Sequence, residues 1–146
     1  LHFHRALRYG TCVCSIRRDS QRRANIWFST LFGGGTNYAH GEDTLFLCDA
    51  FRRGLRVYTS SFCLGTCAKD VSTCFHGFDE KYFHDQGVLY RAAFGAAAAP
   101  LCLRFCLKRY SAYRGEMTFF RALRAMYWGT RETPRDKRPQ HGTGAQ

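Results

Sequence analysis

Residues 42–59 read EDTLFLCDAFRRGLRVYT and carry the clearest structural pattern in the chain. Their apolar residues recur with the spacing of one helix face, at Phe46, Leu47, Ala50 and Phe51. The acidic pair Glu42-Asp43 suits the first turn of that helix, and Gly54 suits the position just after its end. The alternation that follows predicts a strand at 55–59. Because helix, glycine and strand in this order are typical of an α/β unit, we expect an α/β fold.

The rest of the chain predicts a second strand and further helices. Residues 10–17 alternate loosely, as a short strand does, and residues 17–23 form a turn or one short helix. Apolar stripes predict helices at 79–94 and 116–128. The helices should therefore dominate the second half of the chain.

The excess of basic residues favours an anionic partner, but it does not indicate which kind of anion. The 146 residues suffice for one domain, and 22 basic side chains against 11 acidic ones give a net charge of +11. Such an excess suits nucleic acid, anionic lipid headgroups or the diphosphate of a sugar donor. The alternative is an ordinary set of solvated surface charges.

Eight cysteines raise the question of metal or disulfides. Cys102 and Cys106 stand one helical turn apart in an apolar stretch, which predicts small core residues. Residues 1–9 hold no apolar signal-peptide centre, so we expect reduced thiols and a cytoplasmic protein. A metal-binding module remains an alternative function, and its best ligand set is Cys63, Cys67, Cys74 and His76.

Three blocks of sequence carry a resemblance to a known family. Residues 32–46 read FGGGTNYAHGEDTLF, flanked by NIWF at 25–28 and DAFRRGLRVY at 49–58, and residues 80–87 read EKYFHDQG. In this order they resemble the acceptor side of bacterial family-2 glycosyltransferases of the GT-A type. The resemblance covers about residues 10–128. It implies the C-terminal part of a GT-A (nucleotide-diphospho-sugar transferase) fold, followed by a mostly helical segment.

The resemblance also assigns roles to residues. It makes Asp43 the general base that takes the proton from the acceptor hydroxyl, and Glu42 the neighbour that orients the acceptor. It places the acceptor against four glycines, Gly33, Gly34, Gly35 and Gly41. A carboxylate at a helix N-terminus is held in its charged form by the helix dipole, as a base requires. The alternative is that both carboxylates only stabilise the first turn of a helix.

Two further residues are candidates for contact with the donor phosphates. His76 and Lys81 stand in a loop and at a helix start, from which a positive charge could face a diphosphate. The alternative for each is an ordinary loop histidine or an exposed charge.

The sequence lacks the motif that marks the donor-binding half in this family. The chain contains no Asp-x-Asp motif, so we expect the Mg²⁺ or Mn²⁺ of the intact enzyme to be held elsewhere, and this fragment to be inactive alone. The divisions that follow are 1–78, the acceptor-side part of a catalytic domain; 79–129, a helical extension; and 130–146, a disordered tail.

The expected partners are a nucleotide-sugar donor and a saccharide or lipid-linked acceptor, in polysaccharide synthesis for the cell envelope. Residues 92–103 are uncharged and bracketed by Arg91 and Arg104. They are too short to span a bilayer, but suit peripheral contact with the inner face of the membrane. The alternative is a helix buried against the catalytic domain. A small nucleic-acid-binding module is the other alternative. It needs arginines clustered on one face among aromatic residues, whereas the basic residues here are spread along the sequence, so no nucleic acid is expected.

Overall fold

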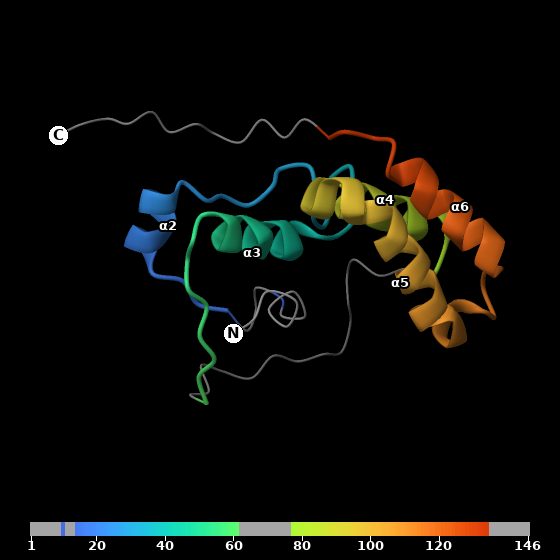
Figure 1. Ribbon diagram of the computed structural model, residues 1–146, viewed down its shortest axis with the longest axis horizontal. Coiled ribbons are helices and arrows are strands. Elements are labelled where there is room, and N and C mark those ends of the chain that lie inside the picture. Colours follow the sequence, from blue (N-terminus) through green and yellow to red (C-terminus); the bar gives the residue numbers. More distant parts are fainter. Residues whose placement is uncertain (1–9, 11–13, 62–76, 135–146) are drawn as a thin grey trace. The chain divides into compact units, whose positions relative to one another are not determined.

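The computed structural model describes residues 10, 14–61 and 77–134, and every regular element in them is a helix. These residues form two compact units, one made of 14–30 and 42–61, the other of 31–41 and 77–134. In chain order the elements of Figure 1 are α2 (Arg18–Ala24), α3 (Glu42–Arg52), α4 (Glu80–Phe94), the 3-10 helix η2 (Gly95–Ala97), α5 (Ala98–Tyr113) and α6 (Phe119–Gly129).

The first unit is built around helix α3. Its core joins Phe46 and Ala50 on one face of α3 to Ile26 after α2, and the ring of Phe28 stacks on Phe46 at 4.2 Å between centroids. Gly54 closes the helix with φ +76°, which lets the amide of Leu55 reach the Ala50 carbonyl at 2.9 Å. The predicted helix and its glycine stop are therefore confirmed.

The predicted α/β, GT-A type fold is wrong for the part of the chain that the structure describes. Residues 55–59 run as irregular chain, as do 14–17 of the other predicted strand, while 11–13 lie outside the described residues. Phe32 and Tyr38 form an isolated bridge, and no named strand occurs in 14–61 or 77–134. An alternating segment gains from extension only when a neighbouring strand accepts its hydrogen bonds. The described residues offer 55–59 no such neighbour.

The second unit is a helical assembly of α4, α5 and α6. Asp79 caps α4 by accepting from the Tyr82 amide at 2.7 Å, which confirms the predicted start of this helix. Helix α6 begins at Phe119 and not at Glu116, because the backbone of Thr118 is extended, with ψ 150°. The Glu116 carboxylate, in the turn before it, accepts from the Phe78 amide at 2.6 Å.

The core of this unit contains the two cysteines that the sequence assigned to it. Cys102 and Cys106 are fully buried with Phe83, Tyr113 and Met126. Burial raises the pKa of the Cys102 thiol to about 12 and also raises the pKa of Cys106. Both thiols therefore stay protonated and act as small packing groups, as predicted.

Helices α4 and α6 pass so closely that their backbones touch through two glycines. A Cβ on Gly87 would lie 2.1 Å from the Met126 carbonyl oxygen, and one on Gly129 would lie 2.1 Å from the His84 carbonyl oxygen. Each helix thus presents a glycine to the backbone of the other. This crossing fixes the position of α4, which carries the site described next.

Candidate loop–helix site

Residues 31–41, which include the three consecutive glycines, form a loop that closes on itself. The Gly33 amide donates to the Tyr38 carbonyl at 2.9 Å, and the Tyr38 amide donates to the Leu31 carbonyl at 3.0 Å. The Thr36 hydroxyl lies 2.8 to 3.1 Å from three carbonyl oxygens inside the turn. The loop is therefore a defined structure with its own hydrogen bonds.

A buried carboxylate on α4 holds this loop in place. Asp85 is 1% exposed, and its Oδ2 atom accepts from the Ala39 amide at 3.0 Å and from the Lys81 ammonium at 2.6 Å. Lys81 also donates to the Asn37 carbonyl at 3.1 Å. Because a buried carboxylate is costly unless it is paired and hydrogen-bonded, these contacts are what allow Asp85 to stay in the interior.

Histidine and tyrosine side chains extend the attachment on both sides of Asp85. His40 Nε2 lies 3.0 Å from Gln86 Oε1, and its ring stacks on Tyr82 at 5.0 Å. At the other end, Tyr38 donates to Glu132 at 2.7 Å. Burial, together with that carboxylate, raises the pKa of Tyr38 to about 12, so the tyrosine remains a donor at neutral pH.

The four predicted acceptor glycines occupy different positions in this arrangement. Gly33 is buried with φ +121°, and a Cβ on Gly41 would lie 2.7 Å from the methyl groups of Leu89. These two shape the loop. Gly34 and Gly35 are exposed, with open space where a Gly35 side chain would stand. Of the four, they are the ones a sugar could approach, and acceptor binding stays a prediction.

The predicted catalytic pair stands directly after the loop in the chain, in the other unit. Glu42 and Asp43 are half-buried in the first turn of α3. Asp43 Oδ1 is buried and has no hydrogen-bond partner. A buried polar atom left unpaired costs about 1–3 kcal/mol, so such an atom calls for an explanation beyond helix stability.

The structure describes only one of the two residues that were predicted to contact the donor phosphates. His76 lies outside the described residues. Lys81 is described, and its ammonium group is engaged with Asp85 and Asn37. Lys81 therefore helps to hold the loop in position from helix α4, and its contact with a donor phosphate stays a prediction.

The described residues do not fit a divalent metal. Within 14–61 and 77–134 no group of three or more His, Cys, Asp or Glu side chains could hold an ion. The cysteine set 63, 67 and 74 with His76 lies outside these ranges. We place no step of any reaction on a metal bound by the described side chains.

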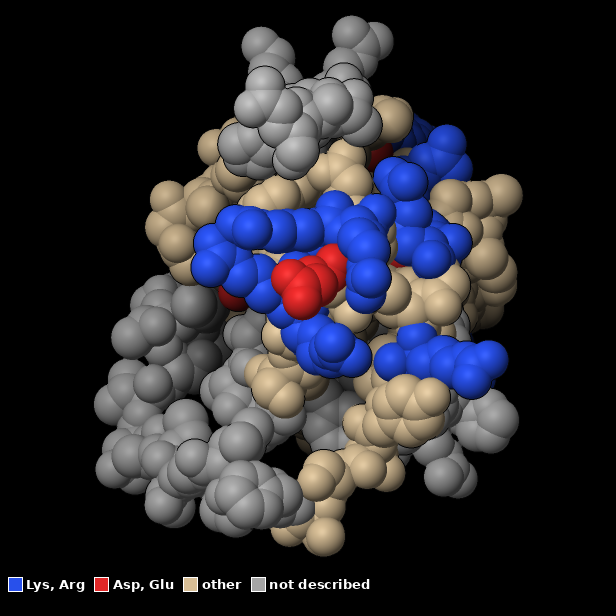
Figure 2. Space-filling view, turned by 90° about the vertical axis from the view of Figure 1, so that its left-hand side faces the viewer, with Lys and Arg blue, Asp and Glu red and all other residues tan. Residues whose placement is uncertain are grey.

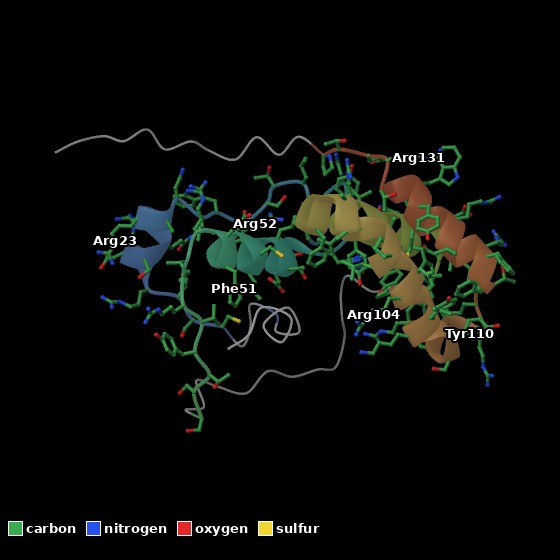
Figure 3. All side chains as sticks on the ribbon, in the orientation of Figure 1. Arg23, Phe51, Arg52, Arg104, Tyr110 and Arg131 are labelled. Carbon is green, nitrogen blue, oxygen red and sulfur yellow. The ribbon has the colours of Figure 1, made fainter. Side chains whose placement is uncertain are left out.

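A hollow of about 680 Å³ opens beside this attachment, within the second unit. Several of its polar side chains are paired with one another: His84 Nε2 lies 3.1 Å from Glu132, and Arg124 lies 4.0 Å from Glu80. The guanidinium of Arg131, which is labelled in Figure 3, lies 4.8 Å from the centroid of the Trp128 ring. These contacts engage several of the polar groups that line the hollow.

Basic side chains gather at the end of the first unit. Helix α2 carries three exposed arginines, Arg18, Arg22 and Arg23. Figure 2 faces this end and shows the Lys and Arg side chains around an acidic one. A nucleic-acid module would interleave aromatic rings with them. Phe28 of the same unit is partly exposed and stacks on Phe46, and the nucleic-acid alternative stays a prediction.

Sequence reasoning missed Asp85 as a functional residue. Its signal was present, because Lys81 and Asp85 stand four residues apart on a predicted helix and can pair there. Nothing in that spacing indicates that the carboxylate faces inward and binds a loop 46 residues away.

Replacing Asp85 with Ala should detach the loop. The Ala39 amide and the Lys81 ammonium would lose their common acceptor, at a cost of about 2–3 kcal/mol. Amide hydrogen exchange should accelerate across residues 33–39 and stay slow in α5. The matched control is Glu80→Ala on the same helix, whose exposed ion pairs contribute less than about 1 kcal/mol. Unchanged exchange at Ala39 in Asp85→Ala would show that Asp85 does not hold the loop.

Comparison with known proteins adds no further assignment. The chain matches no protein family, no curated protein and no solved structure. The resemblance to family-2 glycosyltransferases therefore stays a prediction that depends on the three sequence blocks.

Proposed function

We propose that this chain is the acceptor-side part of an inverting glycosyltransferase, with Asp43 as the general base. The observation that carries the proposal is the buried Asp43 Oδ1 atom, which has no hydrogen-bond partner. A carboxylate oxygen that only stabilised a helix would be expected to bond a backbone amide or to face water. Because Oδ1 is buried, it can accept a proton from an acceptor hydroxyl once the surrounding side chains move to expose it.

The chemistry follows from that role. As the acceptor oxygen attacks the anomeric carbon of the donor sugar, the bond from that carbon to the donor phosphate breaks. The nucleoside diphosphate leaves with the bonding electrons, and the acceptor proton passes to Asp43. Asp43 lies in the first turn of α3, where a negative side chain interacts favourably with the helix dipole.

By the resemblance, the loop at 31–41 also belongs to the acceptor side. It precedes Glu42 in the chain and presents the exposed glycines Gly34 and Gly35. Asp85 and Lys81 belong to the third sequence block of the resemblance, and they fix the loop that belongs to the first. A loop whose geometry is set before binding loses less entropy when it contacts an acceptor.

On this proposal, the donor nucleotide and its divalent metal are bound by a separate donor-binding half, which the described residues do not include. The test is a transfer assay on this chain joined to such a half, with a labelled nucleotide-sugar and a panel of saccharide and lipid-linked acceptors. Labelled product that requires both parts is expected. A joined protein that binds the donor and yet transfers to none of the acceptors would count against the proposal.

A further inference from the structure

Helix α5 has apolar side chains on two faces, and only one of them is covered. Cys102, Cys106 and Tyr113 are fully buried in the core of the second unit. Leu103, Leu107 and Tyr110 follow one another at helical spacing along the neighbouring face and are 39%, 62% and 45% exposed. The second face is therefore an apolar stripe open to solvent.

The stripe continues onto helix α6 through aromatic contacts. The ring of Tyr110 lies 6.2 Å from that of Phe119, and Phe119 lies 5.6 Å from Phe120, which is 80% exposed. We call this surface the α5–α6 patch; it consists of Leu103, Leu107, Tyr110, Phe119 and Phe120. A continuous patch of large, exposed apolar side chains marks a surface that binds a partner, a ligand or a membrane.

Basic side chains border the patch. Arg104 and Lys108 are exposed and each directly follows a patch leucine, so they form a parallel row along the same side of α5. Figure 3 shows Arg104 and Tyr110 on this helix. Neither α5 nor α6 contains an acidic residue. The border therefore carries uncompensated positive charge, and its partner should be negative.

We propose that the α5–α6 patch lies on an anionic lipid surface, with its leucines and aromatic rings at the headgroup boundary and Arg104 and Lys108 on the lipid phosphates. An apolar stripe beside a basic row, with aromatic residues at one end, is the pattern of a helix that rests in the membrane interface. This inference concerns residues separate from Asp43 and does not depend on the proposed transfer reaction.

The helix rests on the bilayer and does not cross it. By length and composition, the helical stretch Glu80–Tyr113 could span a membrane. Its apolar residues Val88, Leu89 and Cys102, however, are buried inside the second unit and not available to lipid. Helix η2 also interrupts the stretch at Gly95–Ala97.

The experiment is flotation of the full chain with vesicles of equal parts phosphatidylglycerol and phosphatidylcholine, and with phosphatidylcholine alone. We expect binding to the anionic vesicles at low salt and release at high salt. Replacing Arg104 and Lys108 with Gln should weaken it about 30-fold. The control, Arg22→Gln with Arg23→Gln, removes the same charge from the exposed surface of α2 and should change binding far less.

A second pair of variants tests the apolar part. Leu107→Gln should weaken vesicle binding, whereas Tyr58→Gln, at a residue 75% exposed in the other unit, should not. Circular dichroism should show unchanged helix content in both. The proposal is overturned if the parent chain fails to float with anionic vesicles at low salt. It is also overturned if both charge variants lose binding equally, or if bound protein resists alkaline carbonate as a spanning helix does.

Discussion

Replacing Asp43 with Asn is expected to lower the rate of sugar transfer by about 10²–10⁴-fold, because that is the usual effect of losing a general base. The rate is measured in the enzyme with its donor-binding half restored. Asn keeps the size of Asp43 and an oxygen at the start of α3, but it cannot take the acceptor proton. The affinity for the nucleotide-sugar should stay the same. The free energy of unfolding should fall only by about 0.3–1 kcal/mol, through the lost interaction with the helix dipole.

Two matched variants make that result specific. Asp49→Asn is the same substitution on the same helix, at a residue that pairs with Arg52 at 3.5 Å, and transfer should be nearly normal. Glu42→Gln should lower transfer less than Asp43→Asn if Glu42 only orients the acceptor. Near-normal turnover in both Asp43→Asn and Glu42→Gln would mean that the two carboxylates merely stabilise α3. The proposed mechanism would then have no base.

Replacing Gly87 with Ala should strongly destabilise the second unit, although it adds only one methyl group. The added Cβ would meet the backbone of α6 at Met126, and backbone atoms cannot move aside as a flexible side chain can. Helices α4 and α6 must separate, which costs about 3 kcal/mol, the upper end of the range for overpacked cores. Urea denaturation should show a much lower midpoint, with the loop at 31–41 losing its protection together with α4.

The control for this prediction is Gly115→Ala in the same unit. A Cβ at Gly115 meets nothing within 4 Å, so the midpoint should change little. Gly129→Ala, at the reciprocal contact with His84, should resemble Gly87→Ala. Equal midpoints for Gly87→Ala and Gly115→Ala would show that the two helices do not cross at these glycines.

Helices were predictable from sequence because their signals are local. The stripe of Phe46 and Ala50, the stop at Gly54 and the cap at Asp79 all act within a few residues, and α3 and α4 form where these signals indicate. The strand at 55–59 was predicted from an equally local alternation, and it fails because a strand also needs a neighbour. Alternation alone carries no information about whether that neighbour exists.

The attachment of the loop could not be predicted for a related reason. Gly33 and Gly41 indicate a loop, and the spacing of Lys81 and Asp85 indicates an ion pair, but no local rule joins the two. Their meeting depends on which face of α4 points inward. That choice is set by the close crossing with α6, at glycines that look in the sequence like poor helix formers.

The order of residues along the chain also sets the order in which these contacts can form during synthesis. The described residues of the first unit end at residue 61, and its core contains Ile26 and Phe46, which stand on either side of the loop at 31–41 in the sequence. The loop obtains its contacts in two steps, because Asp85 and Lys81 on α4 are synthesised before Glu132. Tyr38 and Glu132 are 94 residues apart, so at about 5–20 residues per second their synthesis is separated by roughly 5–20 s. A nascent chain halted between α5 and α6 would therefore have the loop bound to α4 without the Tyr38–Glu132 bond, and Phe83 packed against α5 without Met126 of α6. That is the state in which a chaperone would meet it.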